Sequence, residues 1–103
     1  MKDLFIGAIH SKNRIKLVFF SKEDNVSVVR ICAPMDYGPS RRSRDKSDRF
    51  HLWDYDSDVA SHVLSLLPGQ VRQIEVLPLA FDPAEFVTWT PNWFVSRDWG
   101  DYS

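Results

Sequence analysis

The chain has little cysteine and no long apolar segment. Its single cysteine, Cys32, has no second cysteine with which to form an intramolecular disulfide, and its apolar surroundings (VVRICA) predict a buried thiol. Nowhere do about 18 apolar residues follow one another, and the start of the chain lacks the apolar core of a signal peptide. The sequence therefore predicts neither a membrane span nor secretion, and we expect a reducing, cytoplasmic location.

An excess of charge and the common catalytic motifs are also missing. Thirteen Lys and Arg residues face fourteen Asp and Glu residues, so the formal net charge is −1 and the molecule as a whole does not attract polyanions. There is no glycine-rich phosphate loop, nucleophile elbow or paired-cysteine motif. At 103 residues the chain has the size of one domain, with little sequence to spare for a deep substrate cavity. We therefore expect a single domain over residues 1–103 that is not an enzyme, needs no cofactor and acts by binding.

The first half of the chain predicts one helix and two strands. Apolar residues at helical spacing, from Leu4 to Ile9, predict a short N-terminal helix that ends near Lys12. Residues 15–20 and 26–33 are rich in β-branched and aromatic residues and predict a β-hairpin. Pro34 cannot donate a hydrogen bond to a strand ladder, so we expect it to end the second strand and residues 35–48 to form a long loop.

The second half predicts three more strands and an aromatic tail. Residues 49–56, 61–67 and 71–79 have strand-like patterns, with a turn at Pro68 and Gly69. Five short strands and one helix favour a mainly β fold, a small SH3-like or Sm-like barrel with a core over about residues 4–83; an open α+β sheet is the alternative. Residues 84–103 would then be an aromatic C-terminal extension, and their pattern fits a helix from Thr90 to Gly100 as well as a strand.

The order of these elements and several local residues resemble the WYL domain family, bacterial Sm/SH3-like barrels found mostly in transcriptional regulators. The resemblance covers about residues 4–83 and rests on four features: the opening GAIHSKNRIKLVFF, Arg30 ahead of Pro34, the strand RFHLWDYD, and LSLLPGQVRQIEVL followed by FDP. The Trp-Tyr-Leu triplet of the family falls on Phe50, His51 and Leu52, so two of its three positions differ here. The resemblance implies a stand-alone, non-enzymatic sensor or regulator that binds nucleic acid or a small anionic ligand on one face of the barrel.

Local charge points to the same kind of ligand. The segment of residues 41–49, here called the basic loop, carries a net charge of +3 while the rest of the chain carries −4. Guanidinium groups pair with two phosphate oxygens at once, and neighbouring aromatic rings stack on bases. The predicted ligand-binding residues are Arg30, Arg41, Arg42, Arg44, Lys46, Arg49, His51, Trp53 and Tyr55. The alternatives are a solvated loop whose charges bind nothing, and core positions for Trp53 and Tyr55.

The aromatic tail offers a second class of function. Seven aromatic residues lie between Phe81 and Tyr102, and tryptophan is common at binding hot spots. If the tail projects, Trp89, Trp93 and Trp99 would bind a protein partner or a second copy of the chain. The alternative is that the tail packs across the open end of the barrel.

Acidic and histidine residues give a weaker signal. Asp54, Asp56 and Asp58 alternate along the chain and would place carboxylates on one side, but Val59 and Ser65 stand where a calcium-binding EF-hand loop needs glycine and glutamate. The three histidines have no zinc-ligand spacing. We therefore predict no metal site and keep a metal-dependent hydrolase only as a remote alternative.

Overall fold

The computed structural model describes residues 1–56 and 62–103. It contains one helix, α1 (Lys2–Ser11), and five strands: β1 (Asn13–Ser21), β2 (Val26–Pro39), β3 (Asp48–Asp54), β4 (His62–Leu66) and β5 (Val71–Ala80). All strand pairs are antiparallel, in the order β4-β3-β2-β1-β5. Within the described residues, no helix is long and apolar enough to cross a membrane.

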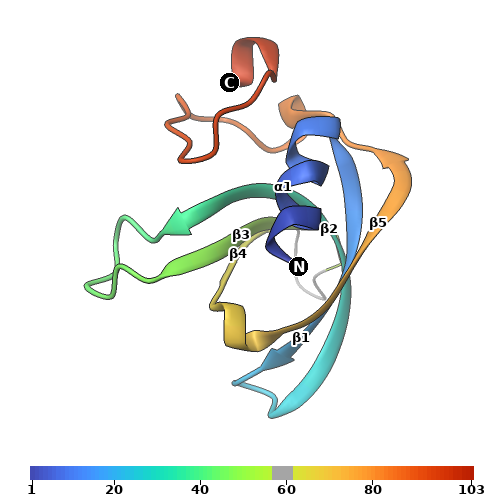
Figure 1. Ribbon diagram of the computed structural model, residues 1–103, viewed down its shortest axis with the longest axis vertical. Helices are drawn as coiled ribbons and strands as arrows, with labels where there is room; N and C mark the ends of the chain where they lie inside the picture. Colours follow the sequence, from blue (N-terminus) through green and yellow to red (C-terminus); the bar gives the residue numbers. More distant parts are fainter. Residues whose placement is uncertain (57–61) are drawn as a thin grey trace.

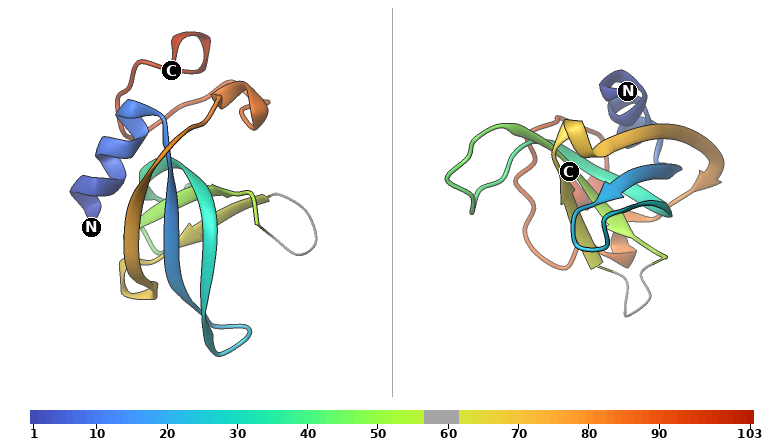
Figure 2. Two further views of the ribbon diagram at one scale, coloured as in Figure 1. Left: turned by 90° about the vertical axis from the view of Figure 1, so that its right-hand side faces the viewer. Right: turned by 90° about the horizontal axis from the view of Figure 1, so that it is seen from below.

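The sheet bends strongly, so that its first and last strands approach each other. β4 and β5 stand at opposite ends of the strand order, yet only the short turn Pro68–Gln70 joins them. Figures 1 and 2 show the sheet curling round, with α1 lying across one open side. The predicted mainly β fold of five strands with an N-terminal helix is confirmed.

The helix ends where the sequence predicted. Lys12 adopts a left-handed conformation with φ of 57°, and its backbone N–H donates to the carbonyls of Ala8 and Ile9. Phe5, Ala8 and Ile9 form the buried face of α1. This geometry turns the chain directly into β1 and lays the helix against β2 and β5.

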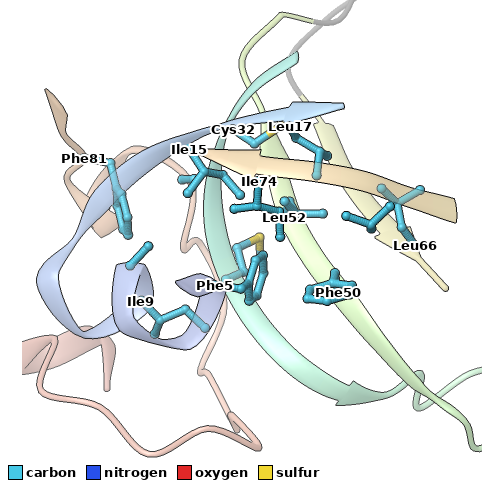
Figure 3. Close-up of a cluster of buried hydrophobic side chains, with 14 of the residues drawn as sticks. Phe5, Ile9, Ile15, Leu17, Cys32, Phe50, Leu52, Leu66, Ile74 and Phe81 are labelled. Atoms are coloured by element: carbon cyan, nitrogen blue, oxygen red, sulfur yellow. The ribbon is translucent and has the colours of Figure 1, made fainter. Parts of the chain in front are cut away.

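The core lies between α1 and the concave face of the sheet. Alternate side chains of β1 are buried there, and the same alternation continues on β3, where Phe50 and Leu52 point inward. Figure 3 shows Phe5 of the helix among Phe50, Leu52 and other strand residues. Cys32 is fully buried, as predicted, and burial raises the pKa of its thiol well above the ordinary value.

The prediction that Pro34 ends the second strand is wrong. β2 continues through Pro34 to Pro39, and Pro34 pairs with Leu52 of β3. The register shifts between Pro34 and Asp36, so a bulge accommodates the residue that lacks a backbone N–H. The loop is consequently shorter than predicted, and the residues after Met35 belong to a strand that carries one wall of a cleft.

The aromatic tail is neither a helix nor a strand between Thr88 and Trp99. Its regular structure is limited to two short 3-10 turns, Pro83–Glu85 and Gly100–Tyr102. Phe86, Val87 and Trp99 are buried, and Figure 1 shows the tail folded over the end of the sheet where α1 runs into β1. The tail therefore packs on the barrel, which is one of the two arrangements that the sequence left open.

Candidate functional site

A cleft of about 430 Å³ lies between the folded-back tail and the sheet. Ser40, Arg41 and Arg42 line it where β2 runs into the basic loop, and His51 of β3 and Ser65 of β4 line it on the sheet. The opposite wall comes from the tail and includes Trp89, Asn92, Trp93 and Phe94. The cleft thus combines cationic, aromatic and hydrogen-bonding side chains, and its volume is within the usual range for small-molecule sites, about 300–1,000 Å³.

Asp36, a nearly buried residue of β2, holds the tail wall in place. Its carboxylate accepts the backbone N–H groups of Phe94 and Val95, each at 2.9 Å. It also accepts the N–H of Tyr37 on its own strand. One side chain on the sheet therefore sets the position of a tail segment that has no strand ladder of its own.

Arg97 completes this attachment from the tail side. Its fully buried guanidinium lies 3.2 Å from the Asp36 carboxylate and donates to the carbonyl of Met35. The indole rings of Trp93 and Trp99 flank it, with centroids at 4.2 and 4.3 Å. Burial lowers the pKa of Arg97 to about 10 against the opposing effect of Asp36, so the guanidinium is still protonated at neutral pH.

Phe94, which lines the cleft, lies between Gly38 and Arg41. A Cβ atom at Gly38 would come within 2.6 Å of Phe94 Cδ2, so only glycine admits the ring at this distance. On the same ring the Arg41 guanidinium lies 4.1 Å from the centroid, and its Nη2 donates to the carbonyl of Asn92 at 2.6 Å. Arg41 is therefore partly a structural residue that fastens the tail to the basic loop.

His51 bridges two strands on the sheet side of the cleft. Its Nε2 lies 2.9 Å from the carbonyl of Gly38, which can only accept, so Nε2 carries a proton. Its Nδ1 lies 2.8 Å from the Ser65 hydroxyl. Because both ring nitrogens have partners, the His51 ring is fixed in orientation. The Ser65 hydroxyl is the polar group next to it in the cleft.

The structure brings part of the predicted site together. Arg41, Arg42 and His51 line the cleft, and so do Trp89 and Trp93, which the sequence had assigned to a different function. Lys46 lies in the same loop, with Nζ donating to the carbonyl of Ser40 at 3.1 Å. Arg42 and Arg44 are exposed and make no hydrogen bond or ion pair with any described residue. Of these two, Arg42 lines the cleft, and Arg44 is an exposed residue of the same loop.

Other predicted residues do not join this group. Arg30 lies nine residues before Pro39 on β2, up to about 30 Å along a strand, and its Nε is 3.5 Å from the Asp54 carboxylate. Arg49 is near Asp45 at 3.9 Å. The expectation that Arg30 shares one surface with the basic loop is therefore wrong, because the two lie at opposite ends of the β2–β3 hairpin.

Trp53 of β3 and Tyr55, just after β3, contact the fold rather than the cleft. The ring of Trp53 stacks on Phe86, with centroids 5.7 Å apart, and the Arg14 guanidinium lies 4.4 Å from the centroid of Tyr55. Both rings pack against the core. These contacts match the alternative that placed Trp53 and Tyr55 in core positions.

The three tail tryptophans have different environments. Trp99 is only 3% exposed, and its indole N–H donates to the carbonyl of Ile9 at 2.8 Å. Trp93 is half-buried and donates to the carbonyl of Tyr102. Trp89 is 44% exposed. Of the three, Trp89 alone offers an open ring face to a ligand or partner.

The acidic residues form no cluster suited to a metal ion within the described residues. Asp54 accepts the N–H of Asp56 and pairs with Arg30 of β2, and Asp56, just after β3, accepts the N–H of Ile31 on β2 at 2.8 Å, so both carboxylates have partners on β2. Asp58, the third member of the predicted alternation, lies outside the described residues. Hydrogen bonds from Ser47 hold the pKa of the exposed Asp45 below its ordinary value.

Sequence reasoning missed Asp36, Phe94 and Arg97, which build the cleft wall. The available signal was an aspartate inside the apolar run ICAPMDYG and an arginine between tryptophans, since charged residues in such surroundings are usually paired. Their partners are 58 to 61 residues apart, so no local pattern indicated which pair would form.

Comparison of the chain with protein-family models, with curated proteins and with solved structures gives no match.

Proposed function

We propose that this protein binds a nucleotide unit, free or within single-stranded nucleic acid, in the cleft between the tail and the basic loop. The observation that carries the proposal is that an exposed indole, Trp89, and the guanidinium of Arg42, which makes no hydrogen bond or ion pair with any described residue, line one cleft. We expect binding without chemistry: the Ser65 hydroxyl has His51 Nδ1 at 2.8 Å, but the other ring nitrogen of His51 donates to the Gly38 carbonyl, and no described carboxylate orients the ring as covalent catalysis usually requires. A sensory or regulatory role, as the WYL resemblance implies, belongs to the same proposal.

The chemistry of a nucleotide matches the two sides of the cleft. A base stacks on Trp89, since every base has a π-face and stacking is worth about 1–3 kcal/mol. The phosphate extends toward Arg42, whose planar guanidinium pairs with two oxygens. In a longer strand, the next phosphates follow the basic loop to Arg44 and Lys46.

A fluorescent single-stranded oligonucleotide titrated into the protein at two salt concentrations tests the proposal. The informative variant replaces Arg42, Arg44 and Lys46 with glutamine and keeps Arg41, which holds the tail. We expect weaker binding and a salt slope of log K that is smaller by about 2, since each lost contact to a single strand removes about 0.7.

The matched control replaces Lys16, Lys22 and Arg72 with glutamine. These residues are exposed on β1, the β1–β2 turn and β5, so the net charge changes equally while the cleft is untouched. Equal losses in the two variants would mean that binding is not at the cleft, and absence of binding by the unaltered protein would refute the proposal. Titration with a mononucleotide distinguishes a free nucleotide from a strand as the ligand.

A further inference from the structure

The tail wall of the cleft is a segment held at both ends. We call residues 88–98 the strap. Its neighbours Val87 and Trp99 are buried at 5% and 3% exposure and anchor it to the core, whereas most residues between them are exposed or half-buried. Long segments without regular structure are uncommon in small domains and are often functional.

Between its anchors, the strap is attached by side chains. In the part of the chain that the structure describes, no backbone-to-backbone hydrogen bond joins the strap to the sheet. The bonds that do so are those of Asp36 to Phe94 and Val95, of Arg97 to Asp36 and Met35, and of Arg41 to Asn92. Two half-buried strap side chains, Trp93 and Val95, also pack against the core, so opening of the strap breaks these contacts together with those of Asp36.

The energetics of this attachment favour local opening. A buried ion pair contributes little net stability because desolvation of both charges offsets their attraction, but it fixes geometry. Opening of the strap hydrates Asp36 and Arg97 again and leaves the anchor Trp99 and all strand ladders in place. No apolar residue of the strap belongs to the fully buried core, and segments with few buried apolar contacts belong to the low-stability end of a protein.

We propose that the strap opens and closes as a unit, with Asp36 as its latch, and that the cleft exists only in the closed form. Its role, which rests on the function proposed above, is to regulate access of the nucleotide to the cleft. Affinity for the ligand is then reduced by the fraction of molecules in which the strap is open.

Amide hydrogen exchange of the protein without any ligand tests this inference. The reporters are the amides of Phe94 and Val95, which donate to the latch, and the Trp99 indole N–H, which donates to Ile9 at the anchor. We expect the two strap amides to exchange at least about tenfold faster than the Trp99 indole and the β1–β2 ladder amides. Exchange of all of them at one rate would mean that the strap opens only when the whole protein unfolds, and would overturn the inference.

Asp36→Asn and its control Asp98→Asn extend the test. Both remove one negative charge, but Asp98 is an exposed strap residue whose one hydrogen bond with a described residue is from the Gly100 N–H. We expect Asp36→Asn to speed exchange at Val95 at least about tenfold further while the ladder is unchanged, and Asp98→Asn to have no such effect. If Asp36→Asn does not fold, the exchange pattern of the unaltered protein still decides. Because no nucleotide is present, this result is independent of whether the proposed function holds.

Discussion

The carboxylate of Asp36 and the guanidinium of Arg97 form a buried ion pair, with 3.2 Å between Oδ1 and Nη2, across 61 residues of sequence. The pair joins the end of β2 to the aromatic tail and thereby places Trp89 opposite the basic loop. The ion pair thus forms a cleft between β2 and the tail, two segments that are not joined by a strand ladder.

Arg97→Met tests how the pair acts. Removal of one partner from a buried pair usually costs about 3–5 kcal/mol, because the other charge is left buried without compensation. Here we expect a loss of less than about 3 kcal/mol in the free energy of unfolding, because the strap can open and hydrate Asp36. Urea denaturation followed by circular dichroism measures it. A loss in the full range would show that the strap is rigidly part of the core.

Gly38→Ala tests the close approach of Gly38 to Phe94, which lines the cleft. The new Cβ would lie 2.6 Å from Phe94 Cδ2, so the ring must move and we expect a loss of about 1–3 kcal/mol in unfolding free energy together with weaker oligonucleotide binding. Gly7→Ala is the matched control: nothing lies within 4 Å of its Cβ, and the exposed helical site predicts a gain of about 0.5–1 kcal/mol. The clash is supported if Gly38→Ala costs little stability when it is introduced into the Phe94→Ala variant, which lacks the ring. It is contradicted if Gly38→Ala costs the same free energy of unfolding with and without the Phe94 ring.

Substitutions of Trp99 and Trp89 distinguish a residue that stabilises the core from one that binds the ligand. We expect Trp99→Ala to cost about 3–5 kcal/mol, because it removes a buried ring that packs on Phe81 and Trp93. Trp89→Ala changes stability by less than about 0.5 kcal/mol, since the ring is half-exposed, but weakens oligonucleotide binding about tenfold through loss of stacking. Thermal denaturation and the oligonucleotide titration measure the two effects. Unchanged binding by Trp89→Ala would argue against base stacking.

Cys32 predicts a loss of stability at alkaline pH. Its pKa is raised chiefly by burial and further by Asp54 and Asp56, against the effect of Arg30. The folded thiol therefore keeps its proton above pH 9.0, its ordinary pKa, where the unfolded thiol loses it. Stability is fully present below that pH and falls as pH rises, by up to about 1.4 kcal/mol per pH unit from this group.

Urea denaturation of the protein and of Cys32→Ala at several pH values between neutrality and the alkaline range measures this slope. We expect a shallower fall in the variant. The fall that remains includes Tyr55, whose pKa burial also raises. Identical slopes would mean that the thiol is accessible to water in the folded state.

Local patterns were sufficient to predict the helix and the presence of five strands along the chain. The apolar face of α1 and the alternation on β1 and β3 are properties of consecutive residues, which is why their positions agree with the sequence within a few residues. The prediction at Pro34 was wrong because a bulge, in which β2 has one extra residue relative to β3, allows proline inside a strand.

The cleft was beyond what local patterns contain. Arg41, Arg42 and His51 were identified from charge and neighbouring aromatic residues. The tail wall of the cleft, however, depends on hydrogen bonds to Asp36 from residues 58 and 59 positions away in the sequence. The spacing of residues in the tail fitted a helix and a strand equally well. The tail forms neither, because its path is set by side-chain attachments to the sheet. Arg30 was grouped with the basic loop because both are cationic, and only the strand register separates them.

The most direct test of the central claim is an NMR titration with the single-stranded oligonucleotide, read at the four tryptophan indole N–H groups and the backbone amides. We expect the signals of Trp89, Asn92 and residues 40–46 to shift together, while those of Trp53, Trp99 and Arg30 stay in place. Shifts centred on Arg30 and Asp54, or none at the cleft when the oligonucleotide binds, would contradict it.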